Sequence, residues 1–280
     1  MKVAVVGLGL IGGSFEKASR RAGHEVVTLH HGDATGFETA DLILLCLPPE
    51  AIVPWMIRHQ AAIRPGAFVV DIAGIKRDIM RDYAAAFPEK PAWTFVGGHP
   101  MAGREVSGYA NSLATLFDGA SMILVPQEGG GEVMRRETGD MKGLDSYFRS
   151  VGFARVVVTT AEKHDEMIAF TSQLCHVIAT AYSRDTLVPE TPGFSAGSYA
   201  DMTRIATQDP AIWASLFLAN RDSLGNVVDR FIARMTAFRD ALADGDRAKI
   251  EAIISEGAEA KRREKAKAKV EVEGEVEVEG

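Results

Sequence analysis

The sequence predicts two domains, an α/β domain built on a parallel sheet over residues 1–160 and an all-α domain over residues 161–260. In the first half, short β-branched apolar runs alternate with helix-like segments, as in a sheet with helices on its faces. Beyond residue 160, apolar residues recur at helical spacing instead. Residues 261–280 are low in complexity, and their composition predicts a disordered tail.

Apolar runs mark the strands of the first domain. Leu42–Leu47 is apolar on both faces, which is typical of a buried parallel strand. A helix is expected over Leu10–Ala22, ended by Gly23, and a surface loop over Gln127–Gly131. The other expected strands are Val3–Val6, Glu25–Leu29, Ala67–Ile72, Thr94–Val96, Met122–Val125 and an edge strand Arg155–Val158.

The second half is predicted to be helical. Ala161–Tyr182 contains few turn residues, and the Pro-, Gly- and Ser-rich segment Val188–Ser198 interrupts the helical pattern. Asp209 followed by Pro210 is typical of a helix start. The apolar stripe that follows, Trp213–Leu242, is roughly 40 Å long if its helix is unbroken. We expect this stripe to pack against a second copy in a homodimer, with packing inside one chain as the alternative.

Composition excludes several classes of protein. The 280 residues include 31 Lys and Arg against 38 Asp and Glu, a net charge of −7, which argues against nucleic-acid or acidic-membrane partners. The longest apolar run is too short to cross a bilayer, and Met1–Gly7 reads as a strand and turn rather than a signal peptide. Cys46 and Cys175 form no metal-ligand pair. We therefore expect a cytoplasmic protein without a metal site.

Gly7–Gly12 (GLGLIG) has the pattern G-x-G-x-x-G, directly after a strand and at the start of a helix. Gly7 permits a tight turn, Gly9 lets a pyrophosphate approach the backbone, and Gly12 allows close packing of the helix. The helix N-terminus adds free N–H groups for the phosphates. The pattern predicts a dinucleotide-binding, Rossmann-like domain, and the alternative is a glycine-rich turn without a ligand. The expected cofactor contacts are Gly7, Gly9, Leu10, Ile11 and Gly12.

The end of the second strand leaves the choice between NAD and NADP open. NAD-selective sites usually carry Asp or Glu there, but this position is His30, which does not repel a 2′-phosphate. Asp33, three residues later, is still able to reach a ribose hydroxyl. After the next strand, Pro48 is expected to lie above the nicotinamide half of the cofactor. His30 and Pro48 complete the predicted cofactor site.

His99 is the candidate base. It stands in Gly97–Gly103 (GGHPMAG), after a strand, and therefore at the edge of the sheet where open α/β folds bind ligands. Imidazole titrates near neutral pH and suits general-base catalysis. A structural role in the loop is the alternative.

Six longer segments are distinctive: GLGLIGGS (7–14), VDIAGIK (70–76), GGHPMAGREVSG (97–108), LFDGASMIL (116–124), KHDEMIAFTSQLCHVIATAY (163–182) and DMTRIATQDPAIWASLFLANRD (201–222). Together they closely resemble the prephenate dehydrogenase family, over roughly residues 1–260. The family joins a dinucleotide-binding domain to a helical dimerisation domain. The resemblance implies an NAD(P)-dependent oxidoreductase of tyrosine biosynthesis that converts prephenate to 4-hydroxyphenylpyruvate by oxidative decarboxylation.

Three other functions remain open at this point. Arogenate dehydrogenase differs only in an amino group on the substrate side chain. A two-domain dehydrogenase of the 3-hydroxyacid type is a second alternative, against which the HPMAG segment argues. A dinucleotide-binding regulator without catalysis is the third.

The resemblance also implies roles for single residues. His99 matches the catalytic histidine that takes the proton of the substrate hydroxyl, and Arg204 matches the arginine that binds the ring carboxylate. His176 matches a histidine on the substrate side of the cleft. His164 matches a further family position, but we interpret it as a helix-start or packing residue. Trp213 is interpreted as a core residue, with a place in the lining of the pocket as the alternative.

One position departs from the family pattern. Many members carry serine in a D-x-x-S-x-K segment, where its hydroxyl helps to hold the substrate and the histidine. This chain has Gly74 there. Either a water molecule or another residue, such as Ser107, is expected to replace that hydroxyl.

Overall fold

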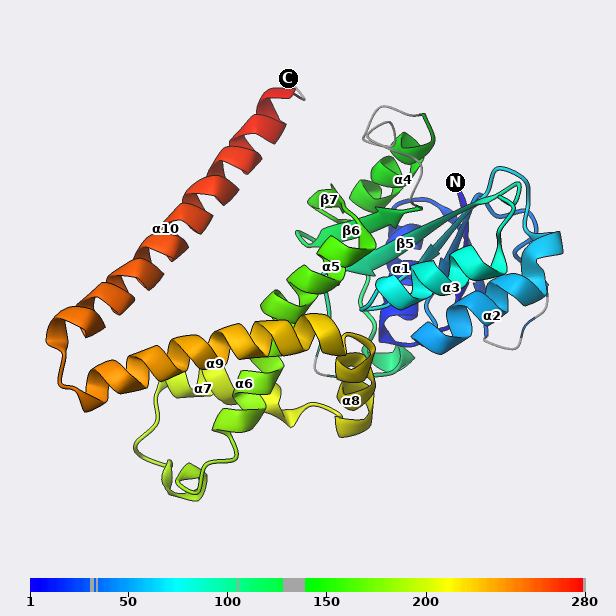
Figure 1. Ribbon diagram of the computed structural model, residues 1–280. Coiled ribbons are helices and arrows are strands. Elements are labelled where there is room, and N and C mark those ends of the chain that lie inside the picture. The colour runs from blue at the N-terminus through cyan, green and yellow to red at the C-terminus, as the bar shows by residue number, and fades with distance from the viewer. Residues whose placement is uncertain (31–32, 34, 105, 128–138, 279–280) are drawn as a thin grey trace. The chain divides into compact units, whose positions relative to one another are not determined.

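A seven-stranded sheet forms the first part of the chain, with the strand order β2-β1-β3-β4-β5-β6-β7 (Figure 1). The five strands from β2 to β5 along this order are parallel, β6 runs antiparallel to β5, and β7 runs parallel to β6. The predicted fold class is confirmed. The strands are β1 (Lys2–Val6), β2 (Glu25–Leu29), β3 (Leu42–Leu45), β4 (Phe68–Asp71), β5 (Thr94–Pro100), β6 (Ser121–Pro126) and β7 (Arg155–Val158).

This computed structural model describes residues 1–30, 33, 35–104, 106–127 and 139–278, without the side chains of residues 139–141 and 268–278. Most of the predicted loop Gln127–Gly131 lies outside the described residues. The helices of the first part are α1 (Leu10–Arg21), α2 (Pro49–His59), α3 (Arg77–Ala86) and α4 (Gly139–Ser150). Those of the second part are α5 (Ala161–Ile168), α6 (Leu174–Tyr182), α7 (Gly197–Thr203), α8 (Pro210–Ala219), α9 (Arg221–Ala243) and α10 (Arg247–Val278).

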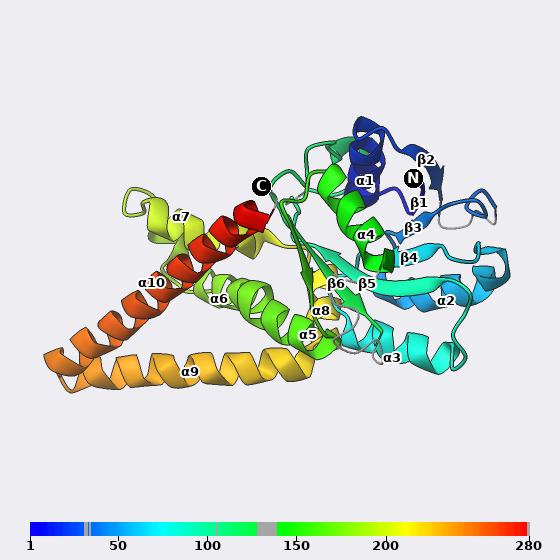
Figure 2. The same ribbon diagram turned by 90° about the horizontal axis from the view of Figure 1, so that it is seen from above.

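The alternation of side chains along β1 divides the core into two layers. Val3 and Val5 pack on one face with residues of α1 and α4, and Ala4 and Val6 pack on the other with residues of α2 and α3. Figure 2 shows the two pairs of helices on opposite sides of the sheet. Because both faces are covered, the central strands are apolar throughout, as the sequence predicted for the third of them.

Strand β5 extends further than the sequence predicts. Thr94–Val96 was the expected strand, but pairing with β6 continues through Gly98 and His99, which lie opposite Leu124 and Ile123. Gly98 permits this pairing, since a Cβ there would overlap the backbone of Asp71. His99 therefore lies within a strand rather than in a loop, and its backbone is fixed by the sheet.

Two breaks divide the helices predicted for the second part. The expected helix Ala161–Tyr182 contains a π-turn at Ala169–Gln173. The apolar stripe from Trp213 is interrupted at Asn220, which ends α8 with a non-helical backbone. The predicted start of α8 is confirmed, because Asp209 caps it by accepting hydrogen bonds from two backbone N–H groups of its first turn.

By contacts, the chain divides into two compact units, Met1–Leu224 and Gly225–Gly280. The predicted boundary near residue 160 stays a prediction, and it falls between the last strand and α5. In the second unit, the chain turns between α9 and α10 at Gly245, where φ is +65°. Among the described residues, no helix is long and apolar enough to cross a membrane.

The segment predicted as a disordered tail, residues 261–280, is helical as far as Val278. Lys, Arg, Glu and Ala are strong helix formers, so the composition that indicates low complexity also favours a helix. Lys261 and Glu264 form an ion pair one turn apart, and Arg263 forms another with Glu259. Residues 279–280 lie outside the described part.

Candidate active site

The glycine loop leaves a free helix N-terminus at the end of β1. Gly7 has φ = +93°, and a Cβ on Gly12 would overlap the Gly7 carbonyl, so both positions require glycine. Gly9 is the N-cap of α1 and supplies no side-chain cap, and nothing lies within 4 Å of where its Cβ would be. The N–H groups of the first turn, which begins with Leu10 and Ile11, therefore receive no side-chain cap from Gly9. This loop fits the pyrophosphate of a dinucleotide.

The strand order places Pro48 at the same edge of the sheet. The chain leaves β1 towards β2 on one side and returns to β3 on the other, so the carboxyl ends of β1 and β3 form the switch point where such folds bind ligands. Leu47 contacts the glycine loop, since its Cδ2 lies 3.1 Å from where a Cβ on Gly7 would be. Pro48 follows directly, exposed, as the N-cap of α2.

The carboxylate of Asp33 lies at the end of β2, a position that the sequence did not determine. The backbone N–H of His30 donates a hydrogen bond of 2.7 Å to Oδ2 of Asp33. His30 itself is exposed. The negative charge of Asp33 therefore lies at the strand end, where Rossmann-like folds hold the adenine ribose.

His99 belongs to a buried chain of hydrogen bonds. Its Nδ1 lies 2.9 Å from Nε2 of His164, and Nδ1 of His164 lies 2.7 Å from Oδ1 of Asp165. Burial by itself raises the pKa of Asp165, but hydrogen bonds from His164 and from the backbone of Arg77 hold this pKa below its usual range. An ionised carboxylate only accepts, so His164 donates from Nδ1 and accepts at Nε2 from His99. Nε2 of His99 is left as an acceptor.

Gly74 and Leu216 border the space in front of His99. A Cβ on Gly74 would lie 3.9 Å from Nε2 of His99 and 3.8 Å from Cδ2 of Leu216 in α8. The missing family serine would therefore point at the basic nitrogen. Ser107 is exposed, and its described hydrogen bonds include none to His99, so we do not assign it as the replacement.

Burial lowers the pKa of His99 to about 3, with further lowering by the positive charge of Lys76, while Asp165 acts in the opposite direction. The Lys76 side chain is fully buried, and its ammonium forms an ion pair with Asp71 and donates to the Ala73 carbonyl at 2.9 Å. The positive charge of Lys76 disfavours a second positive charge on the imidazole of His99. His99 is therefore neutral at pH 7 and able to accept a proton.

The π-turn brings His176 towards the face of the helix that carries His164. The two residues are twelve positions apart, which in a continuous α-helix would separate them by roughly 120°. The π-turn takes up one extra residue, so the separation falls to roughly 20°. The ring of His176 stacks on Trp213, with the centroids 3.6 Å apart. Trp213 is half-buried, so its prediction as a core residue is only partly right.

Arg204 is exposed and begins the short 3-10 helix Arg204–Thr207. This segment packs beside α6, where Gln208 donates a hydrogen bond of 2.9 Å to the hydroxyl of Thr180. Arg204 therefore lies on the side of the helical part that carries His176. Its role towards a substrate stays a prediction.

His164 lies near the start of α5 and is 1% exposed, which agrees with its interpretation as a helix-start or packing residue. It also joins His99 to the carboxylate of Asp165, a role that the sequence did not indicate. The neighbouring Asp165 and the pair Gln173 and Asn220, all buried, were not singled out at all. The His-Asp dipeptide at the start of a predicted helix was the one available signal, because a histidine beside a carboxylate is a common arrangement for fixing a tautomer.

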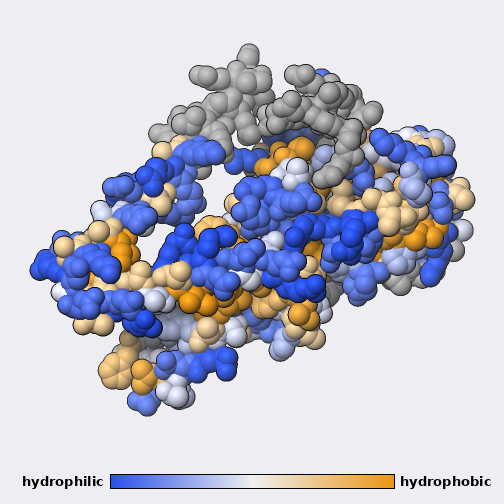
Figure 3. Space-filling model, in the orientation of Figure 1, coloured by the Kyte–Doolittle hydropathy of each residue, from blue (hydrophilic) through white to orange (hydrophobic). Residues whose placement is uncertain are grey.

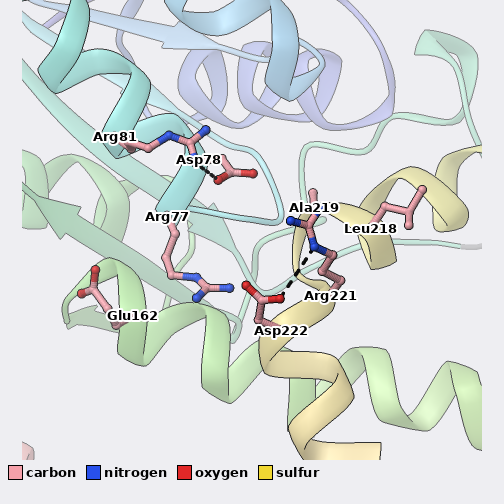
Figure 4. Close-up of a pocket in the computed structure, with 8 residues that line it drawn as sticks. All are labelled: Arg77, Asp78, Arg81, Glu162, Leu218, Ala219, Arg221 and Asp222. Atoms are coloured by element: carbon pink, nitrogen blue, oxygen red, sulfur yellow. Dashed lines mark hydrogen bonds and ion pairs between the residues drawn. The ribbon is translucent and has the colours of Figure 1, made fainter.

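A cavity of about 500 Å³ lies between the start of α3, the start of α5 and the junction of α8 and α9 (Figure 4). Arg77 reaches into it from the first turn of α3, facing the junction of α8 and α9. No group of three His, Cys, Asp or Glu side chains able to hold a metal occurs among the described residues. The cavity is lined by Arg77, Asp78, Arg81, Glu162, Leu218, Ala219, Arg221 and Asp222.

A glycine loop that fits a pyrophosphate and a neutral, half-buried histidine, both carried by one sheet, are typical of a nucleotide-dependent dehydrogenase. Two sequence profiles of one family match the chain. The profile "Prephenate dehydrogenase, nucleotide-binding domain" matches residues 6–136, and "Prephenate dehydrogenase, dimerization domain" matches residues 160–256. The chain belongs to the prephenate dehydrogenase family, and its nucleotide-binding domain is one for NAD(P).

Individual relatives agree with this assignment. Cyclohexadienyl dehydrogenase of Zymomonas mobilis is 29% identical over an alignment covering 87% of this chain and 90% of the relative. Prephenate dehydrogenase of Bacillus subtilis is 27% identical, over 87% of this chain and 71% of the relative. The fold resembles Synechocystis arogenate dehydrogenase with a TM-score of 0.79 at 21% identity, covering 94% of this chain and 99% of that one.

Proposed function

We propose that this protein oxidises prephenate with decarboxylation to 4-hydroxyphenylpyruvate, with His99 as the general base. The observation that carries the proposal is the orientation of His99. Its Nδ1 is held by His164, and its free Nε2 faces the space beside Gly74. A neutral imidazole in this arrangement is suited to take the proton of a substrate hydroxyl.

The proposed chemistry assigns a task to each group. Nε2 of His99 takes the proton of the C4 hydroxyl as the C4–H bond gives up its hydride. Loss of carbon dioxide then makes the ring aromatic, and protonated His99 returns its proton to the phenolate oxygen. The bound nicotinamide supplies the hydride acceptor. While His99 carries this proton, Asp165 stabilises its positive charge through His164.

Arg204 and His176 are proposed to bind the substrate. A guanidinium donates two parallel hydrogen bonds to a carboxylate, so Arg204 suits the ring carboxylate of prephenate. His176 stacks on Trp213 within the helical part and is proposed to line the same cleft. Aromatisation supplies the driving force of the reaction. These side chains are therefore proposed to contribute mainly by positioning the substrate.

A steady-state assay that crosses prephenate and arogenate with NAD and NADP tests this function. We expect the highest kcat/KM with prephenate. Higher kcat/KM with arogenate would reassign the substrate and keep the site. Absence of turnover with all four combinations would reject the proposal in favour of a dinucleotide-binding regulator.

We propose NAD as the preferred cofactor and expect Asp33→Asn to lower the ratio of kcat/KM for NAD to that for NADP about tenfold. The carboxylate of Asp33 lies at the end of β2 and would repel a 2′-phosphate. Residues 22–57 contain no Lys or Arg to attract one. Glu38→Gln, which removes a second carboxylate from this segment, is the matched control and should keep the ratio. An NADP preference in the unchanged protein would contradict the proposal.

We also propose a homodimer formed through the helical part, and expect light scattering at micromolar concentration to report twice the mass of one 30.2 kDa chain. Large apolar side chains remain exposed in the single chain, and Figure 3 shows apolar surface over the loop after α6. A single-chain mass would remove this proposal and leave the enzymatic one. The exposed side chains of the first unit include Leu187, Phe194, Ile212 and Leu218.

A further inference from the structure

The carboxylate of Asp165 accepts a hydrogen bond from His164 and further hydrogen bonds from Arg77. Asp165 is 1% exposed. Its Oδ2 accepts hydrogen bonds from the backbone N–H of Arg77 at 3.0 Å and from Nε of the same residue at 3.4 Å. Its Oδ1 accepts from the backbone N–H of Lys76 at 2.9 Å as well as from His164. Within the described residues, the Arg77 guanidinium is the only side-chain cation paired with Asp165, apart from His164 if protonated.

Asn220 connects Asp165 and Arg77 to the π-turn. It is fully buried, and its Nδ2 donates to the Asp165 carbonyl at 2.9 Å and to Oε1 of Gln173 at 2.8 Å. Its Oδ1 accepts from Nη2 of Arg77 at 3.3 Å. Gln173, the last residue of the π-turn, donates to the carbonyl of Leu216. One network therefore joins α3, α5, the π-turn and the end of α8.

Two of these elements approach His99 directly. Helix α5 carries His164, which holds Nδ1 of His99, and α8 carries Leu216, which borders the space in front of Nε2. The position of the imidazole thus depends on groups whose mutual placement is fixed by Asp165 and Asn220. Arg77 bonds to both of them.

Arg77 is also the member of the network that solvent reaches. Its side chain is 33% exposed and points into the cavity drawn in Figure 4, where it faces the junction of α8 and α9. A cavity of about 500 Å³ is large enough to admit a small planar cation from solution.

We propose that Arg77 is a positioning residue for the base: its guanidinium fixes Asp165 and Asn220 so that His164 holds His99 with Nε2 towards the substrate. This inference rests on the proposed role of His99. Removing the guanidinium leaves a buried carboxylate without its cation, which is costly and favours rearrangement. A shift of the imidazole by about 1 Å is sufficient to cost up to about 100-fold in rate.

The test is chemical rescue of Arg77→Ala. We expect kcat to fall roughly 10- to 100-fold, while the KM values for substrate and cofactor change less than about twofold, since Arg77 is not among the residues proposed to bind either. Millimolar guanidinium chloride should then restore much of the lost kcat, because the ion fits the vacated place from the open cavity. His99→Asn and the unchanged protein should gain nothing from guanidinium.

Arg81→Ala is the matched control. Arg81 lies one turn further along α3 and lines the same cavity, but it pairs with Asp78 and Asp82 and makes no described contact with Asp165. Its kcat and its response to guanidinium should equal those of the unchanged protein. Wild-type kcat in Arg77→Ala, or a rise in KM alone, would overturn the proposal. So would a loss of kcat in a folded variant that guanidinium does not recover.

The kinetics of Arg77→Lys and the NMR signals of the histidines provide two further tests. If Arg77→Ala does not fold, Arg77→Lys keeps the charge without the fork that reaches both partners, and we expect a lower kcat with unchanged KM. Wild-type kcat in that variant would reject the proposal.

The ¹⁵N NMR signals of the imidazoles report the network without any turnover. We expect His99 and His164 to be protonated at Nδ1, Arg77→Ala to change the His164 signals, and guanidinium to restore them. Unchanged His164 signals in the variant would reject the role of Arg77. An inactive protein that showed the expected signals would reject the proposed function alone.

Discussion

His99→Asn should lower kcat roughly 10²- to 10⁴-fold with little change in KM, which is the range typical for loss of a general base. The amide cannot take the proton of the substrate hydroxyl at Nε2, but it is similar in size and keeps one polar contact with His164. Steady-state kinetics with prephenate and NAD measure the effect. Wild-type kcat in this variant would show that the base is elsewhere.

The pH dependence of kcat/KM tests the same residue in the free enzyme. Burial and the nearby Lys76 charge lower the pKa of His99 to about 3. A lowered pKa means that the neutral, active form persists as the pH falls through about 6.5, where an unperturbed histidine would become protonated. We therefore expect no loss of kcat/KM from His99 near pH 6.5, and an acid limb only well below it. An acid limb centred near 6.5 and absent in His99→Asn would contradict this.

Arg204→Ala separates binding from proton transfer. It removes a charge-assisted hydrogen bond proposed for the ring carboxylate, so KM for the substrate should rise strongly. The pH profile of the remaining activity should keep its shape, because His99 is unchanged. A fall in kcat without a rise in KM would instead place Arg204 with the groups that act in the transition state.

Gly9→Val should weaken NAD binding by roughly 10²- to 10⁴-fold, as expected for the loss of one or two hydrogen bonds to a charged pyrophosphate. A side chain at this position occupies the place where the phosphates approach the N–H groups of α1. The fold should survive, since nothing lies within 4 Å of the new Cβ and the backbone of Gly9 is extended. Titration calorimetry with NAD measures the affinity, and the melting temperature measures the fold.

Gly12→Ala is the contrasting variant. Its Cβ would overlap the carbonyl of Gly7, so this substitution should lower the melting temperature as well as the affinity. A Gly9→Val protein with unchanged NAD affinity would show that the glycine loop is not the cofactor site.

Local patterns in the sequence were sufficient for the fold class and for the conformation of the glycine loop. The apolar run of the third strand, the glycine spacing at Gly7–Gly12 and the capping pair Asp209 and Pro210 each report a conformation over a few neighbouring residues. Backbone conformation and burial act on that scale, so such features are visible without the structure. The placement of His99 at the edge of the sheet followed from the same patterns.

Tertiary packing alone decided what surrounds His99. His164 lies 65 positions away in sequence, and Asn220 lies 55 positions from the Asp165 carbonyl that it contacts. The extension of β5 lies in its pairing with β6, and the π-turn and the break at Asn220 are joined by a side-chain hydrogen bond between distant segments. Periodicity carries no information about such contacts, because their geometry depends on how whole elements pack against one another. The sequence therefore determined the sheet, the glycine loop and a candidate base. Only the packed structure decided which groups fix that base and leave its Nε2 free.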